Sequence, residues 1–180
     1  MRKLLLLLSF ISTYSYSQIT GCTFPGSLNY NPNANIDDGS CCDTLSQSYQ
    51  LGQDIDGLQD DNSGSSVSVS SNGNVVAIGS PNYNATMGVV RVYEFNGSSW
   101  SQRGSDLLGN SNSETGYSVA LSSQGDTLIH GSPKGNNNDG YVNIYNWNGT
   151  SWNHLEYISG ANGQRAGESV EINNDGSIVS

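Results

Sequence analysis

A repeat of 52 residues is the feature that most constrains the fold of this chain. The stretch 64–81 reads GSSVSVSSNGNVVAIGSP and returns at 116–133 as GYSVALSSQGDTLIHGSP. The stretch 88–100, GVVRVYEFNGSSW, returns with the same step at 140–152 as GYVNIYNWNGTSW. Similarity at a fixed period of this length is typical of solenoids, propellers and arrays, in which each unit packs against its neighbours. We therefore expect a modular fold built from copies of one unit.

Each copy of the unit has the period-two pattern of β-strands. Val67 and Val69 alternate with serines, as Val119 and Leu121 do in the next copy, which predicts a half-buried first strand. Asn-Gly and Gln-Gly pairs then predict hairpin turns. The remaining predicted strands are a buried second strand at 75–78 and 127–129, an aromatic third at 89–95 and 141–147, and a fourth beginning at Trp100 and Trp152. No segment carries a helix signal, so the unit is four antiparallel strands.

An all-β fold with four short strands per unit of this length predicts the blades of a β-propeller. The repeats occupy 49–180: a closing strand and loop at 49–63, blade 1 at 64–115, blade 2 at 116–166 and a partial blade 3 at 167–180. The segment 49–55 matches 101–107, so we expect it to be the outermost strand of the last blade. Because propellers use about 4 to 8 blades, the ring is incomplete here, and we expect a longer protein.

The N-terminus predicts export. Arg2 and Lys3 precede a short apolar run ending at Ile11, and small residues follow at 15–17, as in a secretory signal peptide spanning 1–17. The apolar run is too short to cross a membrane, which needs about 20 residues. We expect a secreted or surface protein with no membrane insertion after signal removal. The alternative is a lipoprotein anchored at Cys22, since 19–22 loosely fits a lipobox.

Three cysteines follow the signal peptide. In an exported protein they predict a small disulfide-stapled loop module at 18–42, with Cys22 paired to Cys41 or Cys42, and a linker at 43–48. The module resembles a short Cys-bounded module of secreted and surface proteins of the Bacteroidetes type. The resemblance rests on GCT at 21–23, NYNP at 29–32 and DDGSC at 37–41.

Charge excludes one class of partner. Sixteen acidic and six basic residues give a formal net charge of −10, so clustered cations that would neutralise phosphates are lacking. We expect no nucleic-acid partner. Catalytic motifs are also missing, because His130 and His154 stand in different strands and no nucleophile elbow or phosphate-binding loop occurs. We expect no enzyme activity from these residues.

At the level of the repeat, the pattern Gly-x-Ser-Val-x-Leu-Ser-x-x-Gly followed by apolar-Gly-Ser-Pro resembles the FG-GAP, integrin-α-like propeller family. The closer likeness is to a bacterial and algal variant of this family with Val-Tyr-x-(Trp/Phe)-Asn-Gly-x-x-Trp. The resemblance implies an extracellular recognition or adhesion scaffold. Calcium-binding blades of that family carry several carboxylates in one hairpin loop, where this chain keeps only Asp126 and Asp175. We therefore do not expect calcium in these hairpins.

Two other acidic stretches are tentative calcium sites, since Ca²⁺ takes six to eight oxygen ligands. Asp37 and Asp38 lie in the cysteine module, and Asp54, Asp56 and Asp60 form the densest acidic run before the repeats. The alternative for both stretches is a solvated turn without metal. Calcium is accordingly the only cofactor that the sequence suggests.

The loops that vary most between copies are candidates for ligand contact, because functional residues concentrate on loops held by a rigid scaffold. They are 59–63, 82–87 and 134–139, and the residues singled out are Asn82, Tyr83, Asn84, Lys134, Asn136, Asn137 and Asp139. We expect them to bind an extracellular protein or glycan. The alternative is the N-terminal part of a propeller hydrolase or lyase whose active site lies beyond Ser180.

Overall fold

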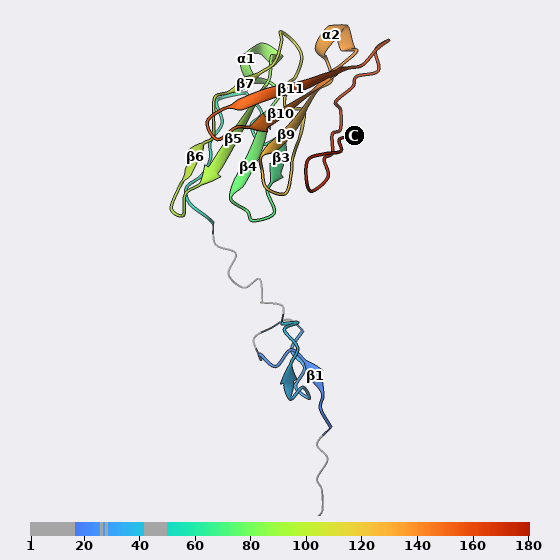
Figure 1. Ribbon diagram of the computed structural model, residues 1–180. Coiled ribbons are helices and arrows are strands. Elements are labelled where there is room, and N and C mark those ends of the chain that lie inside the picture. Colours follow the sequence, from blue (N-terminus) through green and yellow to red (C-terminus); the bar gives the residue numbers. More distant parts are fainter. Residues whose placement is uncertain (1–16, 26, 28, 42–49) are drawn as a thin grey trace, which may run out of the picture. The chain divides into compact units, whose positions relative to one another are not determined.

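The computed structural model of the 180-residue chain describes residues 17–25, 27, 29–41 and 50–180. The chain forms two compact units, divided between Tyr49 and Gln50 (Figure 1). The predicted signal peptide lies outside the described residues except for Ser17. The predicted linker 43–48 and Cys42 also lie outside them.

The N-terminal unit is a loop module closed by one disulfide. β1 (Thr20–Gly21) pairs in parallel with β2 (Ile36–Asp37), and turns rich in Asn, Pro and Gly connect them. Cys22 is buried and bonded to Cys41, with 4.7 Å between the two Cα atoms. Of the two partners that the sequence left open for Cys22, the structure therefore selects Cys41.

The first sheet of the larger unit comes from residues 66–108. Its antiparallel order is β3 (Ser66–Val69), β4 (Val75–Ser80), β5 (Val89–Phe95) and β6 (Trp100–Gln102), and β7 (Leu107–Leu108) also pairs with β5. Gly73 adopts a positive φ in the turn between β3 and β4, as predicted for an Asn-Gly hairpin. The third strand has the predicted bounds, and the fourth begins at the predicted Trp100.

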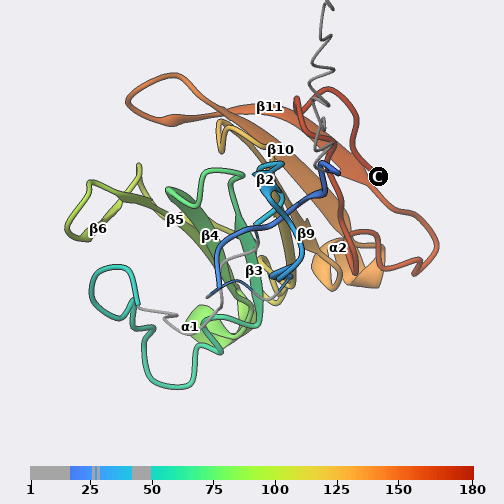
Figure 2. The same cartoon turned by 90° about the horizontal axis from the view of Figure 1, so that it is seen from below.

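The second sheet repeats this topology. Its order is β11 (Trp152–Ser159), β10 (Tyr141–Trp147), β9 (Thr127–Ser132) and β8 (Ser118–Leu121). Figure 2 shows the two sheets side by side. A third copy begins at 167–180, where Ile172 and Val179 form one antiparallel bridge. The larger unit is therefore all-β and built of four-stranded antiparallel sheets in tandem, as expected; a closed ring is not part of it.

The repeat is kept in three dimensions down to single hydrogen bonds. The indole Nε1 of Trp100 donates to the carbonyl of Leu51 (2.7 Å), and Trp152, one repeat later, donates to Arg103 (2.8 Å). Both tryptophans lie over a glycine one position further along the acceptor segment. Residues 50–55, the leading segment, thus contact the first sheet in the same way as residues 102–107 contact the second sheet.

The largest apolar core lies between the two sheets. Val75, Ala77, Val90, Val92 and Leu107 of the first sheet pack against Val119, Leu121, Leu128 and Trp152 of the second. A smaller core joins the far side of the second sheet to the third copy through Ile129, Ile144 and Val170. Each sheet alone would leave an apolar face in water, so stacking of neighbouring copies stabilises the unit.

The prediction of a half-buried first strand holds for only one of the two copies. Val119 and Leu121 are 9% and 8% exposed, so β8 is half-buried as predicted. Val67 and Val69 of β3 are 52% and 55% exposed instead. The physical reason is that the first sheet covers the side chains of β8, whereas among the residues that the structure describes no sheet lies against the outer face of β3.

Candidate functional site

Two of the predicted ligand loops share one unusual backbone. The short turns α1 (Tyr83–Thr86) and α2 (Gly135–Asn138) each contain three successive residues with positive φ, so neither is a regular α-helix. In both, the amide of the sixth residue after the Pro-x pair that follows the strand closes the loop, with Gly88 donating to the carbonyl of Tyr83 and Gly140 to that of Gly135. The sequence differs and the conformation is conserved between copies.

The side chains explain why one loop is easier to form than the other. Asn136, Asn137 and Asn138 occupy the left-handed positions of α2, and Asn tolerates positive φ better than most residues. In α1 the same positions hold Asn84, Ala85 and Thr86. Ala and Thr pay roughly 1–2 kcal/mol each for this conformation. Backbone strain of this kind concentrates at functional sites, which favours α1 as the candidate site.

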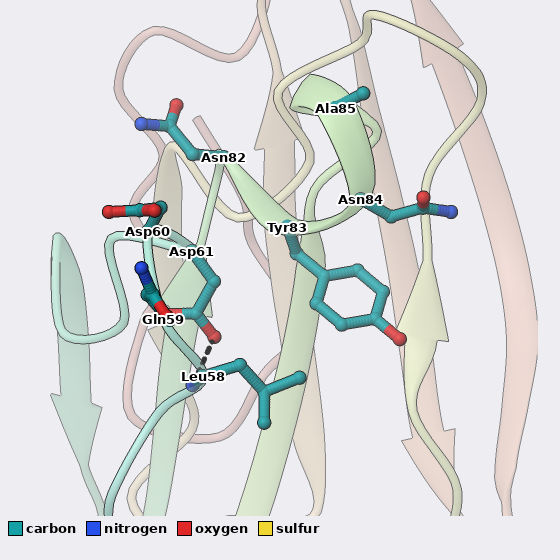
Figure 3. A pocket seen from close by; sticks show the side chains of 8 residues that line it. All are labelled: Leu58, Gln59, Asp60, Asp61, Asn82, Tyr83, Asn84 and Ala85. Carbon is teal, nitrogen blue, oxygen red and sulfur yellow. Dashed lines mark hydrogen bonds between the residues drawn. The ribbon is translucent and has the colours of Figure 1, made fainter.

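A hollow of about 640 Å³ lies beside α1. It is lined by Leu58, Gln59, Asp60, Asp61, Asn82, Tyr83, Asn84 and Ala85 (Figure 3). Two of the three variable loops, 59–63 and 82–87, therefore face one another. The backbone amide of Asn82 donates to the carbonyl of Asp61 (3.1 Å), which ties the two walls together. We call this the first hollow.

Asp61 shapes the first hollow and is already committed to other groups. Its buried carboxylate accepts hydrogen bonds from the amides of Leu58 and Ser63, both at 2.9 Å, and lies 3.7 Å from the Arg91 guanidinium. Asp60 is exposed at the rim and makes none of these bonds. The carboxylate available to a ligand is therefore that of Asp60.

Tyr83 is the aromatic wall of the first hollow, and its ring is held from behind. The guanidinium of Arg91 lies 5.0 Å from the ring centroid. Arg91 is in turn fixed by two hydrogen bonds from its Nε to the Asp106 carboxylate, at 3.1 and 3.2 Å. The Tyr83 ring is thus preorganised next to the amides of Asn82 and Asn84.

A second hollow of about 380 Å³ lies one repeat further along the chain. Its lining residues are Ser111, Asn112, Lys134, Asn136, Asn137 and Asn138. Most are the 52-step equivalents of residues in the first hollow, with Lys134 in place of Asn82. Lys134 pairs with Glu114 at 2.7 Å, and Asn136 donates to the hydroxyls of Tyr157 and Ser159. The two hollows therefore offer different chemistry on the same frame.

The structure sorts the predicted binding residues into three groups. Asn82, Tyr83 and Asn84 line the first hollow, and Lys134, Asn136 and Asn137 line the second. Asp139 lines neither; its carboxylate accepts a hydrogen bond from the Gly163 amide (2.6 Å) and supports the loop. Sequence reasoning missed Leu58, whose side chain is 61% exposed at the first hollow. The signal available in the sequence was that Leu58 is an apolar residue within a polar loop.

The tentative calcium ligands are dispersed. Asp37 and Asp38 lie in the N-terminal unit and accept hydrogen bonds from the amides of Gly39 and Ser40. In the larger unit Asp54 accepts a bond from Gln50, while Asp56 is exposed and Asp60 lies at the first hollow. Within the described ranges, no three acidic, His or Cys side chains gather as a metal site would require. Calcium binding stays a prediction.

The two histidines occupy different environments. His130 is fully buried in β9 and stacks on Tyr145, with 5.6 Å between ring centroids. His154 is exposed on β11, and its Nε2 lies 2.8 Å from the Asn143 side-chain oxygen. Neither histidine lines a hollow described above.

Among the residues that the structure describes, no helix is long and apolar enough to cross a membrane. No protein-family model matches the chain, and no curated protein matches it either.

Proposed function

We propose that this chain is part of a secreted or surface-displayed β-propeller of the FG-GAP, integrin-α-like kind, which recognises an extracellular protein or glycan through its loop rim. One observation carries the proposal. The two hollows stand at equivalent places of the repeat, on one backbone conformation, with different side chains. A constant frame with variable surface residues is the arrangement used for recognition, because loops change without cost to the core.

The first hollow is the stronger of the two candidates. Its lining polar groups are the Asp60 carboxylate and the side-chain amides of Gln59, Asn82 and Asn84, beside the ring of Tyr83; the Asn84 amide also donates to the Met87 sulfur (3.8 Å). Amides and carboxylates hydrogen-bond to hydroxyls and peptide groups, and an aromatic ring packs against apolar faces of a ligand. This combination suits a hydroxyl-rich glycan or a polar peptide segment better than an apolar small molecule.

The disulfide and the N-terminal residues support an extracellular setting. Cys22 and Cys41 are bonded, and structural disulfides persist mainly in oxidising compartments. The basic and apolar residues at the N-terminus supply a route to export. A weakly charged surface rich in Ser, Asn and Gly fits an extracellular protein that presents turns to solvent.

Binding to immobilised glycans and to extracellular matrix proteins tests the proposal. Tyr83→Ala removes the aromatic wall of the first hollow, so we expect at least a tenfold loss of affinity for the ligand that the unmodified protein captures. Ser98→Ala is the matched control, since Ser98 lies in an exposed hairpin away from the hollow. Equal affinity of both variants would mean that the ligand binds at another part of the surface. Capture of neither ligand class would contradict the proposal.

A further inference from the structure

The two walls of the first hollow are turns whose main-chain groups bond within and between the walls. The amide of Asp61 donates to the carbonyl of Leu58 (3.3 Å), and the amide of Asn82 donates to the carbonyl of Asp61 (3.1 Å). The carbonyls of 82–84 accept hydrogen bonds from the amides of 86–88. An extended peptide gains affinity mainly by pairing its main chain with a strand edge. Neither wall is a strand, so this mode of binding does not fit the first hollow.

Recognition in the first hollow therefore depends on side chains. Those of Gln59, Asp60 and Asn82 are exposed, and within the described part of the chain they hydrogen-bond to no other residue. A carboxylate accepts two hydrogen bonds side by side, and a carboxamide donates and accepts side by side. Each of these groups can thus hold two neighbouring hydroxyls, which is the pattern that the edge of a sugar ring presents.

Two apolar surfaces lie beside these polar groups in the first hollow (Figure 3). They are the half-buried ring of Tyr83 and the side chain of Leu58, which is 61% exposed. Arg91 contacts the Tyr83 ring but is not among the residues that line the hollow. The ring therefore meets the hollow on a side that the guanidinium leaves open. A pyranose has C–H groups on its faces and hydroxyls at its edge, so it can pack on Tyr83 and still reach the polar groups.

The second hollow shows that the fold does not require an aromatic ring at this place. The repeat equivalent of Tyr83 is Gly135, and a Cβ on Gly135 would lie 2.2 Å from the Cε1 of Tyr141. Tyr141 is 2% exposed, and its hydroxyl accepts a hydrogen bond from the amide of Asn110 (3.3 Å). Its equivalent in the first copy is the smaller Val89. The second copy thus buries its tyrosine in the frame, whereas the first copy presents one to the hollow.

The charges around the first hollow disfavour an anionic ligand. Asp61 lies 3.7 Å from the Arg91 guanidinium, and Asp106 pairs with the same guanidinium at 3.1 Å. With Asp60 at the rim, three carboxylates accompany one cation, so a second anion would be repelled. Because Asp60 is exposed, a single ion pair with a cationic ligand would add little affinity. Hydrogen bonds and ring packing are left as the main sources of affinity.

We propose that the first hollow is a subsite for one uncharged pyranose unit of an extracellular glycan. The sugar packs a C–H face on Tyr83, while its hydroxyls bond to the Asp60 carboxylate and to the side-chain amides of Gln59 and Asn82. The second hollow, whose described lining contains no aromatic side chain, does not form such a subsite. The assignment rests on the recognition function proposed for the loop rim.

Titration calorimetry with defined oligosaccharides tests the proposal. The probes are neutral hexasaccharides of glucose, mannose, galactose or xylose, and hexagalacturonate is the anionic counterpart. We expect at least one neutral hexasaccharide to bind, and hexagalacturonate to bind at least roughly tenfold more weakly, because its carboxylates meet those of the first hollow.

Four variants connect the binding to the first hollow. Tyr83→Ala should weaken binding of the neutral hexasaccharide about tenfold, whereas Tyr83→Phe, which keeps the ring, should leave it within about threefold. Asp60→Asn keeps hydrogen bonding and removes the charge, so it should hold the same affinity within about threefold and reduce the discrimination against hexagalacturonate. Ser111→Ala, at an exposed position of the second hollow, is the matched control and should change neither affinity.

The other outcomes separate this proposal from the recognition function. Binding of none of the neutral hexasaccharides would overturn the subsite, as would saccharide binding that Tyr83→Ala leaves unchanged. Capture of an extracellular protein through Tyr83, without any saccharide binding, would assign the first hollow to a peptide; it would overturn the subsite and leave the recognition function standing. Capture of neither class would contradict both.

Discussion

At the scale of single residues, His130 is an ionisable side chain in a fully buried position. It occupies the register that Ile78 holds in the first sheet. Its ring is fully buried, and neither ring nitrogen has a hydrogen-bond partner among the described residues. Burial, with a smaller contribution from the charge of His154, lowers the pKa of His130 to about 3. The native state therefore holds this imidazole neutral.

Acid should destabilise the larger unit through His130. In the unfolded chain its pKa is about 6.5, so as pH falls the unfolded state takes up the proton first. The stability tied to the neutral ring is present above that pH and is lost as pH falls from 6.5 towards 3. Between pH 7 and pH 4 we expect a loss of roughly 3 kcal/mol in the free energy of unfolding. Urea titrations at both pH values measure it.

The variant His130→Ile separates this effect from the protonation of carboxylates. We expect its free energy of unfolding to fall by roughly 3 kcal/mol less than that of the unmodified protein between pH 7 and pH 4. His154→Gln, at an exposed position, serves as the control and should keep the pH dependence almost unchanged. An identical pH dependence in all three proteins would mean that His130 is protonated without unfolding.

At the scale of elements, the β-hairpin turns connect strand pairing to sheet stacking. Gly73 and Gly125 have φ values of +73° and +69°, so alanine would cost a similar 1–2 kcal/mol, roughly, in this left-handed conformation at either position. Their neighbours differ, because Val75 packs on Gly125, whereas no residue in the described part of the chain lies within 4 Å of a Cβ placed on Gly73. The pair therefore isolates the contribution of the contact between sheets.

In residues 1–180 we expect Gly125→Ala to lower the free energy of unfolding by about 1–3 kcal/mol more than Gly73→Ala, because the added methyl overpacks the interface. Chemical denaturation monitored by tryptophan fluorescence gives both values. Equal losses would show that the sheets separate at little cost at this point.

The strand pattern was readable from the sequence because it is local. The third strands were predicted with the observed bounds, and the fourth strands with the observed starts at Trp100 and Trp152. The exposure of Val67 was not predictable, since alternation marks an apolar face without saying whether a neighbour covers it. The first hollow joins 58–61 to 82–85, and only the fold places these segments together. The left-handed Ala85 and Thr86 likewise carry no sequence signal.

At the scale of the whole molecule, the two units depend on different forces. The larger unit stacks sheets around apolar cores, whereas the N-terminal unit has one two-residue strand pair and a disulfide. Closing the loop between Cys22 and Cys41, which are 19 positions apart, contributes roughly 3 kcal/mol by restricting the unfolded chain. So small a module has little apolar burial to replace that term.

Replacing both Cys22 and Cys41 with Ser should therefore unfold the N-terminal unit alone. We expect limited proteolysis to cleave within 17–41 and to leave 50–180 intact, with the thermal midpoint of the larger unit unchanged. Mass spectrometry of the fragments identifies the cleavage sites, and a thermal unfolding curve gives the midpoint. A fall in that midpoint would show that the two units support each other, against the independence expected here.

The start of the mature protein decides whether β1 survives export. Cleavage after Ser17 leaves Gln18 first and keeps the pairing of Thr20 with Ile36. Lipoprotein processing would instead begin the chain at Cys22, removing β1, and would attach lipid to the sulfur that the structure bonds to Cys41. We therefore expect secretion without an anchor.

Mass spectrometry of the mature protein, before and after reduction, tests this expectation. A mass starting at Gln18 that gains two hydrogen atoms for the Cys22–Cys41 bond on reduction would confirm it. A diacylglyceryl adduct on an N-terminal Cys22 would contradict it. In that case the fold of the N-terminal unit would have to form without β1 and without this disulfide, and the protein would be held at the membrane surface by its lipid.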